Sequence, residues 1–455
     1  MTLPESATRV VEALDGRRVS RVGFGCYRVD DRTPAHREAL AFALREGVNL
    51  IDTSTNYGDG ASERLVGSVL KETGADAVVV TKAGYVQGLN RAEAIRRKQD
   101  GSPWPEMTEY SDDCWHCISP EFLGDQLTAS LERLQLPKVD VLLLHNPEYF
   151  LMEAEQQLMG LDAARDVFYD RVKRALAHLE TERTAGRIAA YGISSNTFVV
   201  PHPRPEAVDL TRILPVAGPG FRVIQLPMNP LELGAREGIH TAERRSVLDV
   251  ARDAGLSVLV NRPLNAFGPR GLVRFAEVSP PFELVPADGT AWRALAELEQ
   301  EFRKRWAPRL RMEPGAPPPE QLIAFSPLFR EIELQVSDLS AFASAWESHV
   351  APRLDELLPE LERVLGNETG YGDFARRLRQ RIAQVASIAV RRPLARESER
   401  KALLLQQLRK AFGETAGETI SQRTIRALAE TPGVDGVLVG MRRTRYVRDA
   451  LATFS

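Results

Sequence analysis

Four ionisable residues follow predicted strands in the first third of the chain, and together they could form an acid catalyst. They are Asp52, Tyr57, Lys82 and His145. Tyrosine in water loses its proton near pH ~10. A lysine cation beside it favours the phenolate and makes the phenol a stronger acid, and a carboxylate can hold that lysine in place. These groups have the chemistry needed to protonate a carbonyl oxygen while a hydride is delivered to its carbon.

The residues around these four indicate how the chain would position them. Asp52 and Tyr57 lie in the polar run that follows an apolar segment ending at Ile51. Lys82 and His145 each end an apolar run rich in valine and leucine. All four therefore lie at or just beyond the ends of predicted strands.

Short β-branched runs alternate with helical patterns through most of the chain. This alternation predicts an α/β fold, a (β/α)8 TIM barrel, in which active-site residues lie at the carboxyl ends of the strands. A segment from Arg9 to Ser20, with Asp15-Gly16 at its middle, predicts a β-hairpin before the barrel. The eight predicted strands are Val22–Gly25, Val48–Ile51, Val78–Lys82, Val139–His145, Ile188–Ser194, Val223–Leu226, Leu256–Asn261 and Val437–Gly440.

Two segments stand outside the alternation. Residues 85–119, after the third strand, form an enlarged polar and aromatic loop, and residues 277–418, between the seventh and eighth strands, carry amphipathic helical patterns. We therefore expect a barrel domain of residues 1–276 plus 419–455 and a mostly helical insertion of residues 277–418. The insertion could be a solvated surface element, a lid over the barrel or an interface through which copies of the chain assemble.

The overall composition excludes several classes of protein. Lys plus Arg number 59 against 62 Asp plus Glu, and a net charge of -3 argues against a nucleic-acid binder. We expect no membrane span, because no apolar stretch approaches the ~18 residues that one needs. Three cysteines and an N-terminus without a secretory pattern predict a cytoplasmic protein that acts on small molecules.

The run Gly47-Val48-Asn49-Leu50-Ile51-Asp52-Thr53-Ser54, followed by Tyr57-Gly58 and Ser62-Glu63, resembles the first sequence motif of the aldo-keto reductase superfamily. Asp52, Tyr57, Lys82 and His145 match the catalytic tetrad of that superfamily in order and context. The resemblance covers about residues 20–276 and 420–452 and does not include the helical insertion.

The same resemblance implies a nicotinamide cofactor. Ser194 and Asn196 match the residues that hold the nicotinamide carboxamide, and Gln225 matches a further ligand of it. Asn261 or Arg262 stands where the superfamily often places an aromatic residue under the nicotinamide. Gly440 and Arg442 match the loop that takes the cofactor phosphate, and the basic residues there favour NADP, with NAD possible.

The implied reaction is the NAD(P)-dependent reduction of an aldehyde, ketone or sugar, or the reverse oxidation of an alcohol. Tyr57 would be the general acid, Lys82 would lower its pKa, Asp52 would position Lys82, and His145 would orient the substrate. A polar pocket built from His116, Asn146, Arg262 and Asn265 would favour a sugar or polyol dehydrogenase. The alternative to an enzyme is a regulatory subunit that binds a nicotinamide nucleotide with little turnover.

The cluster Cys114-Trp115-His116-Cys117 could bind zinc or form a redox-active dithiol. Zinc needs a fourth ligand, such as Cys26, and an isolated C-x-x-C pair is a weak zinc motif. We therefore expect no metal, and we expect this aromatic-rich segment to pack over the barrel mouth and shape the substrate pocket.

Overall fold

The computed structural model describes residues 5–11, 16–241, 244–268, 271–312 and 317–454 of the chain. It divides into two compact units, one of Met1–Ala276 with Gln407–Ser455 and one of Glu277–Gln406. The second boundary lies within helix α14 (Arg391–Phe412), whereas the sequence places it between residues 418 and 419. The assignment of two domains with these limits stays a prediction.

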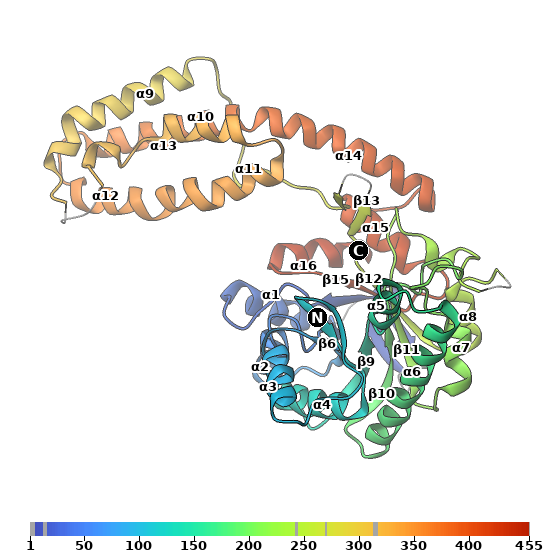
Figure 1. Cartoon of the computed structure of the whole chain (residues 1–455). Coiled ribbons are helices and arrows are strands. Elements are labelled where there is room, and N and C mark those ends of the chain that lie inside the picture. Colours follow the sequence, from blue (N-terminus) through green and yellow to red (C-terminus); the bar gives the residue numbers. More distant parts are fainter. Residues whose placement is uncertain (1–4, 12–15, 242–243, 269–270, 313–316, 455) are drawn as a thin grey trace. The chain divides into compact units, whose positions relative to one another are not determined.

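Eight parallel strands close into a barrel in the first unit, in the order β10-β11-β12-β15-β3-β4-β5-β9 (Figure 1). The predicted (β/α)8 barrel is therefore confirmed, and each predicted strand corresponds to one strand of the barrel. These strands are β3 (Val22–Gly25), β4 (Leu50–Asp52), β5 (Val78–Ala83), β9 (Val139–His145), β10 (Ile188–Ser194), β11 (Phe221–Pro227), β12 (Ser257–Asn261) and β15 (Gly436–Val439).

The strands form because their β-branched residues fit a sheet that is covered on both faces. Every residue of β5 is buried, as expected for a parallel strand between a filled barrel interior and a ring of helices. The helices of this unit are α1 (Pro34–Arg45), α2 (Ala61–Thr73), α4 (Pro120–Leu134), α5 (Tyr149–Gln156), α6 (Leu161–Thr184), α7 (Leu210–Ile213), α8 (Val247–Asp253), α15 (Ile420–Ala429) and α16 (Thr444–Leu451).

Two small hairpins accompany the barrel. The predicted N-terminal hairpin is present, with β1 (Thr8–Val11) antiparallel to β2 (Arg17–Ser20). Its expected turn residue Asp15 lies outside the described residues, and Gly16 has a φ of 68°. The second hairpin pairs β13 (Asn265–Gly268) with β14 (Gly271–Arg274) and follows β12.

The segment of residues 85–119 is more ordered than the loop that the sequence predicts. It contains β6 (Tyr85–Val86), α3 (Gly88–Gln99), β7 (Thr108–Ser111) and β8 (Cys114–His116), and its strands form a sheet in the order β6-β8-β7. The sequence does not reveal α3 because the helix has a weak apolar face, on which Ala94 is the buried residue.

The second unit has a core of its own, and its described regular elements are helices. Helices α9, α10 and α12 pack on α13 (Figure 1). Buried aromatic side chains such as Phe302, Trp306 and Phe374 fill the space between them. The helices here are α9 (Ala291–Glu301), α10 (Phe325–Gln335), α11 (Leu339–Ala345), α12 (Leu358–Leu365), α13 (Tyr371–Ala389) and most of α14.

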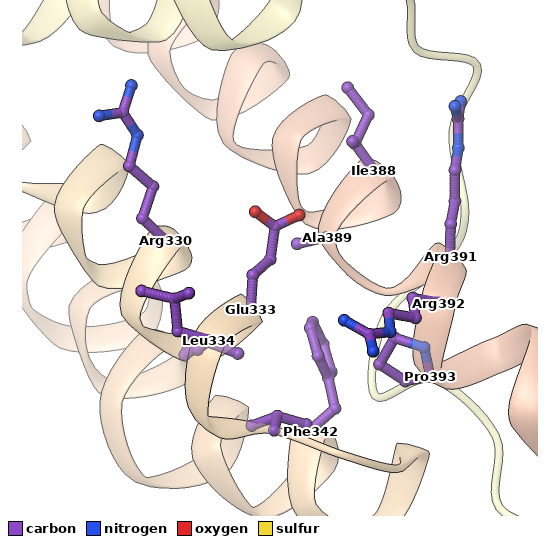
Figure 2. Close-up of a pocket in the computed structure, with 11 residues that line it drawn as sticks. Arg330, Glu333, Leu334, Phe342, Ile388, Ala389, Arg391, Arg392 and Pro393 are labelled. Atoms are coloured by element: carbon purple, nitrogen blue, oxygen red, sulfur yellow. The ribbon is translucent and has the colours of Figure 1, made fainter.

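A cavity of about 540 Å³ lies within the second unit, lined by residues of α10, α11, α13 and α14 and by Val336 between α10 and α11. Figure 2 shows Glu333 and Arg392 reaching into it, with the ring of Phe342 beside them. Among the described residues of the whole chain, the structure contains no helix that combines the length and apolar character of a membrane span.

Candidate active site

The four predicted catalytic residues lie on neighbouring strands or just after them. β4 ends at Asp52, β5 carries Lys82, and β9 ends at His145. Tyr57 lies in the loop that leads from β4 to α2. Because β4 pairs with β5 and β5 pairs with β9, all in parallel, the structure brings the four residues to the same rim of the barrel.

The ammonium group of Lys82 is the centre of this cluster. Its Nζ lies 2.7 Å from Oδ1 of Asp52 and 2.8 Å from Oδ2. It also donates to the carbonyl oxygen of Thr53 at 2.8 Å and to the hydroxyl of Tyr57 at 3.4 Å. The Lys82 side chain is fully buried. A buried cation needs a counter-charge and acceptors for its protons, so these contacts fix the ammonium group beside the phenol.

The pKa of the Tyr57 phenol differs from the sequence-based expectation. Burial raises this pKa well above its usual range, and the negative charge of Asp52 raises it further. The expected lowering by Lys82 does not prevail, because the charge of Asp52 offsets that of the lysine and the phenol is desolvated. Tyr57 therefore keeps its proton at neutral pH, which is the form that a general acid needs.

The imidazole of His145 lies beside the phenol. Its ring meets that of Tyr57 edge to face, with the ring centroids 6.0 Å apart. Nδ1 of His145 lies 3.0 Å from Oγ of Ser54. Burial and, after it, the positive charge of Lys82 hold the pKa of His145 well below its usual value. The ring is therefore neutral at neutral pH and can use Nε2 to hold one polar atom of a substrate.

The predicted carboxamide ligands form a second chain of hydrogen bonds. Oε1 of Gln225, on β11, accepts from the hydroxyl of Ser194 at 3.0 Å and from Nδ2 of Asn261 at 3.3 Å. Nε2 of Gln225 donates to Oδ1 of Asp52 at 2.7 Å. The structure thus brings three predicted cofactor residues together and joins them to the carboxylate that pairs with Lys82.

Several features of these residues fit a nicotinamide nucleotide. Oδ1 of Asn261 is buried and has no hydrogen-bond partner in the described part of the chain, so it could accept from an amide N–H. Asn196 follows β10 and is partly exposed. A Cβ atom built on Gly440 would meet no atom within 4 Å, so a ligand could approach the backbone there.

Gly440 and Arg442 lie in the exposed turn between β15 and α16. This turn is at the carboxyl end of a barrel strand, on the same rim as the tetrad. Backbone N–H groups at the start of α16, together with a guanidinium, have the donor geometry that a phosphate prefers. Helix α16 begins at Thr444, directly after this turn.

The four residues of the predicted polar pocket already make hydrogen bonds within the protein. Nε2 of His116 bonds the carbonyl oxygen of His145 at 2.7 Å, and Nδ2 of Asn146 bonds the hydroxyl of Tyr85 at 2.7 Å. Arg262 pairs with Glu232 at 3.0 Å, and Oδ1 of Asn265 accepts from Arg274 at 3.3 Å. These bonds serve the protein's own structure rather than present a ready set of sugar ligands.

The cluster of Cys114, His116 and Cys117 is likewise engaged in the fold. Besides the His116 bond, Sγ of Cys117 donates to the carbonyl oxygen of Pro105 at 3.3 Å. Burial raises the pKa of Cys117 to about 11 and lowers that of His116 to about 4. In the part of the chain that the structure describes, no three His, Cys, Asp or Glu side chains are placed to share a metal ion.

Sequence reasoning missed two residues that contact the site. Ser54 lies between Asp52 and Tyr57 and contacts His145; its polar side chain directly after the strand was the available signal. Glu148 lies just beyond His145 and accepts a hydrogen bond from the backbone of Asn196. No pattern of spacing pointed to Glu148, because that contact joins two loops far apart in sequence.

Comparison with known proteins identifies the family of this chain. The family model described as "Aldo/keto reductase family" matches residues 21–268. The chain is 29% identical over 199 residues to D-threo-aldose 1-dehydrogenase of a Pseudomonas species, across 42% of this chain and 54% of that protein. It is 33% identical over 122 residues to NADH-specific methylglyoxal reductase of Escherichia coli, across 26% and 34%.

The chain therefore spans about half, or less, of the length of these curated relatives. Among solved structures, a glycerol dehydrogenase from Gluconobacter oxydans aligns with 99% of this chain and 91% of its own length, at 16% identity and a TM-score of 0.46. The family model covers more than half of this chain, and the predicted resemblance is confirmed: the chain belongs to the aldo/keto reductase family.

Proposed function

We propose that this chain is an NAD(P)-dependent oxidoreductase that reduces the carbonyl group of a small molecule, with Tyr57 as the general acid. The observation that carries the proposal is the buried ion pair of Lys82 and Asp52, whose ammonium group lies 3.4 Å from the Tyr57 hydroxyl. A protein that only binds a nucleotide has no use for a buried cation fixed beside a protonated phenol.

Each residue of the tetrad has a distinct role in the proposed reaction. A reduced nicotinamide, when bound, supplies the hydride that adds to the carbonyl carbon. Tyr57 gives its phenolic proton to the carbonyl oxygen, which becomes the hydroxyl of the product alcohol. Lys82 stabilises the phenolate that remains, and Asp52 holds Lys82 in place. The neutral ring of His145 orients the carbonyl oxygen towards Tyr57.

The cofactor would be held by residues of several strand ends. Ser194, Asn196, Gln225 and Asn261 would bind the carboxamide, and Gly440 with Arg442 would bind the phosphate. The exposed guanidinium of Arg442 supports NADP, with NAD possible, because a 2′-phosphate adds charge that arginine binds well. The E. coli relative that is named as NADH-specific keeps NAD open.

The same site suits several classes of substrate. Aldehydes, ketones and open-chain sugars have a carbonyl oxygen that Tyr57 could protonate, and cyclic sugars have a hydroxyl group that it could deprotonate. The Pseudomonas relative is named as an aldose dehydrogenase. The raised pKa of Tyr57 keeps the phenol protonated at neutral pH, and this is the form that donates a proton in carbonyl reduction.

The proposal is tested by titrating the purified protein with NADPH and NADH and then adding a panel of aldehydes, ketones and aldoses. We expect saturable binding and a loss of reduced-nicotinamide absorbance with at least one class of carbonyl. Saturable binding without turnover of any carbonyl, or of any alcohol with the oxidised nucleotides, would instead identify a nucleotide-binding regulatory subunit. No binding of either nucleotide would contradict both functions.

A further inference from the structure

A carboxylate outside the tetrad lies buried against the proposed carboxamide site. Glu148 is just beyond His145, immediately before α5, and is 2% exposed. Its Oε1 accepts the backbone N–H of Asn196 at 2.9 Å. Ser195 and Thr197 lie close enough to lower the pKa of this carboxylate, and the backbone N–H of Thr197 donates to Oγ of Ser195 at 3.1 Å. Glu148 therefore holds Asn196 directly, within the turn of Ser195–Thr197 that follows β10.

The other oxygen of the same carboxylate, Oε2, accepts no such hydrogen bond among the described residues. Oε2 of Glu148 is buried and has no hydrogen-bond partner among the described residues. A buried carboxylate with one unpaired oxygen is costly, and native structures keep such groups mostly where they have a function. Burial raises the pKa of Glu148 to about 7, although its hydrogen bonds oppose that shift.

Two of the titratable groups near Glu148 are phenols. They are Tyr85 on β6 and Tyr149 at the start of α5. Burial raises the pKa of Tyr149 to about 12 and that of Tyr85 still higher, so both are neutral near pH ~7. On the β10 side, the groups that contact Glu148 belong to Ser195, Asn196 and Thr197, which do not titrate. Glu148 therefore gains or loses its charge in the neutral range without a counter-ion among these neighbours.

We propose that Glu148 is a positioning residue for the nicotinamide cofactor: its ionised carboxylate holds the turn of Ser195–Thr197 so that Asn196 can bind the carboxamide, and its protonation releases that turn. This inference rests on the proposed function. Hydrogen bonds to an ionised acceptor are about twice as strong as those to a neutral one. Protonation also turns one carboxyl oxygen into a donor, and Oε2 has no acceptor within the described residues.

The expected consequence is a cofactor affinity that depends on pH. If only the ionised form of Glu148 supports binding, affinity falls by up to about tenfold between pH ~8 and pH ~6. Glu148→Gln keeps an oxygen that can accept the Asn196 N–H but cannot ionise. Its affinity should be weaker than that of the wild type at pH ~8 and should change less between pH ~8 and pH ~6, since only the titration of the nucleotide's 2′-phosphate then remains. Glu148→Asp, which keeps the charge on a shorter side chain, should retain the pH dependence.

Glu299→Gln is the matched control. Glu299 is also a buried carboxylate that accepts a backbone N–H, that of Ser326 at 2.6 Å, and burial raises its pKa. It lies in the second unit, so its substitution should leave both the affinity and its pH dependence unchanged.

The experiment measures the dissociation constant of NADPH by fluorescence titration from pH ~6 to ~8. All four proteins bind the same nucleotide, so titration of its 2′-phosphate contributes equally to each. A second readout is hydrogen exchange of the Asn196 and Thr197 amides in the nucleotide-free protein, corrected for intrinsic rates. Protection should decrease at low pH in the wild type and stay constant in Glu148→Gln.

The outcomes separate this inference from the proposed function. A pH dependence of the NADPH affinity that is smaller in Glu148→Gln than in the wild type, and that keeps its wild-type size in Glu148→Asp and Glu299→Gln, supports the role of Glu148. NADPH binding with the same pH dependence in the wild type and Glu148→Gln overturns that role alone. Absence of NADPH and NADH binding by the wild type overturns the proposed function and the cofactor role of Glu148 with it.

Discussion

Nε2 of Gln225 donates a 2.7 Å hydrogen bond to Oδ1 of Asp52, and this bond links the proposed cofactor residues to the proposed catalytic residues. Asp52 in turn pairs with Lys82 through both carboxylate oxygens. A change at Gln225 should therefore reach the proton donor as well as the nucleotide site.

Replacing Gln225 with leucine removes a donor from a buried carboxylate. We expect Gln225→Leu to lose about 1–3 kcal/mol of unfolding free energy and to bind NADPH at least about tenfold more weakly. Gln126→Leu is the control, because Gln126 is equally buried but bonds Asn90 away from the tetrad. Urea unfolding and nucleotide titration measure the two effects. Equal nucleotide affinity in both variants would show that Gln225 plays no part in the cofactor site.

The buried ion pair predicts a non-additive pattern of stability. Lys82→Met leaves the Asp52 carboxylate without its counter-charge and should cost about 3–5 kcal/mol of unfolding free energy. Asp52→Asn leaves the ammonium group unpaired and should cost a similar amount. The double variant removes both charges and should be more stable than either single variant, while all three lose turnover. Additive losses in the double variant would mean that the two residues do not act as a pair.

Buried histidine should make the protein less stable in acid. The pKa of His116 falls from its usual 6.5 to about 4 in the fold, so the unfolded chain binds a proton at this residue between these values and the folded protein does not. The contribution of His116 to stability is complete above pH ~6.5 and decreases as pH falls towards ~4. By pH ~5 the loss should be about 2 kcal/mol.

His116→Gln removes this titration and keeps an amide donor for the carbonyl oxygen of His145. Chemical unfolding at pH ~7 and ~5 should show a smaller loss in the variant than in the wild type, by about 2 kcal/mol. Glu148, whose pKa is raised, has the opposite pH dependence in this range, so only the difference between the two proteins isolates His116. An identical loss in both would show that the fold does not lower the pKa of His116.

The elements of the barrel could be predicted because its strands are short, mostly apolar runs separated by turns and helical patterns. The positions of Lys82 and His145 on the barrel rim could be predicted because each residue ends an apolar run, whereas their catalytic roles stay a prediction. The helix α3 was missed because it has almost no apolar periodicity, with Ala94 as its buried residue. The raised pKa of Tyr57 was missed because burial and the field of Asp52 depend on the folded positions of both groups.

Contacts between loops also could not be predicted from the sequence. Glu148 and Asn196 are joined by a side chain to backbone bond, and such a bond leaves no pattern in either local sequence. The substrate is undetermined by the sequence for the same reason, since the segment of residues 85–119 supplies side chains such as Tyr85 whose partner, Asn146, comes from another loop.

The account depends most directly on the phenol of Tyr57. Tyr57→Phe removes the hydroxyl beside Lys82 and should lower the rate of carbonyl-dependent NADPH oxidation by about 10²–10⁴-fold, the usual contribution of a general acid. NADPH affinity should change little. Tyr191→Phe is the control, because its hydroxyl bonds Glu180 at 2.8 Å rather than Lys82, and it should keep the wild-type rate. Wild-type turnover in Tyr57→Phe would contradict the account.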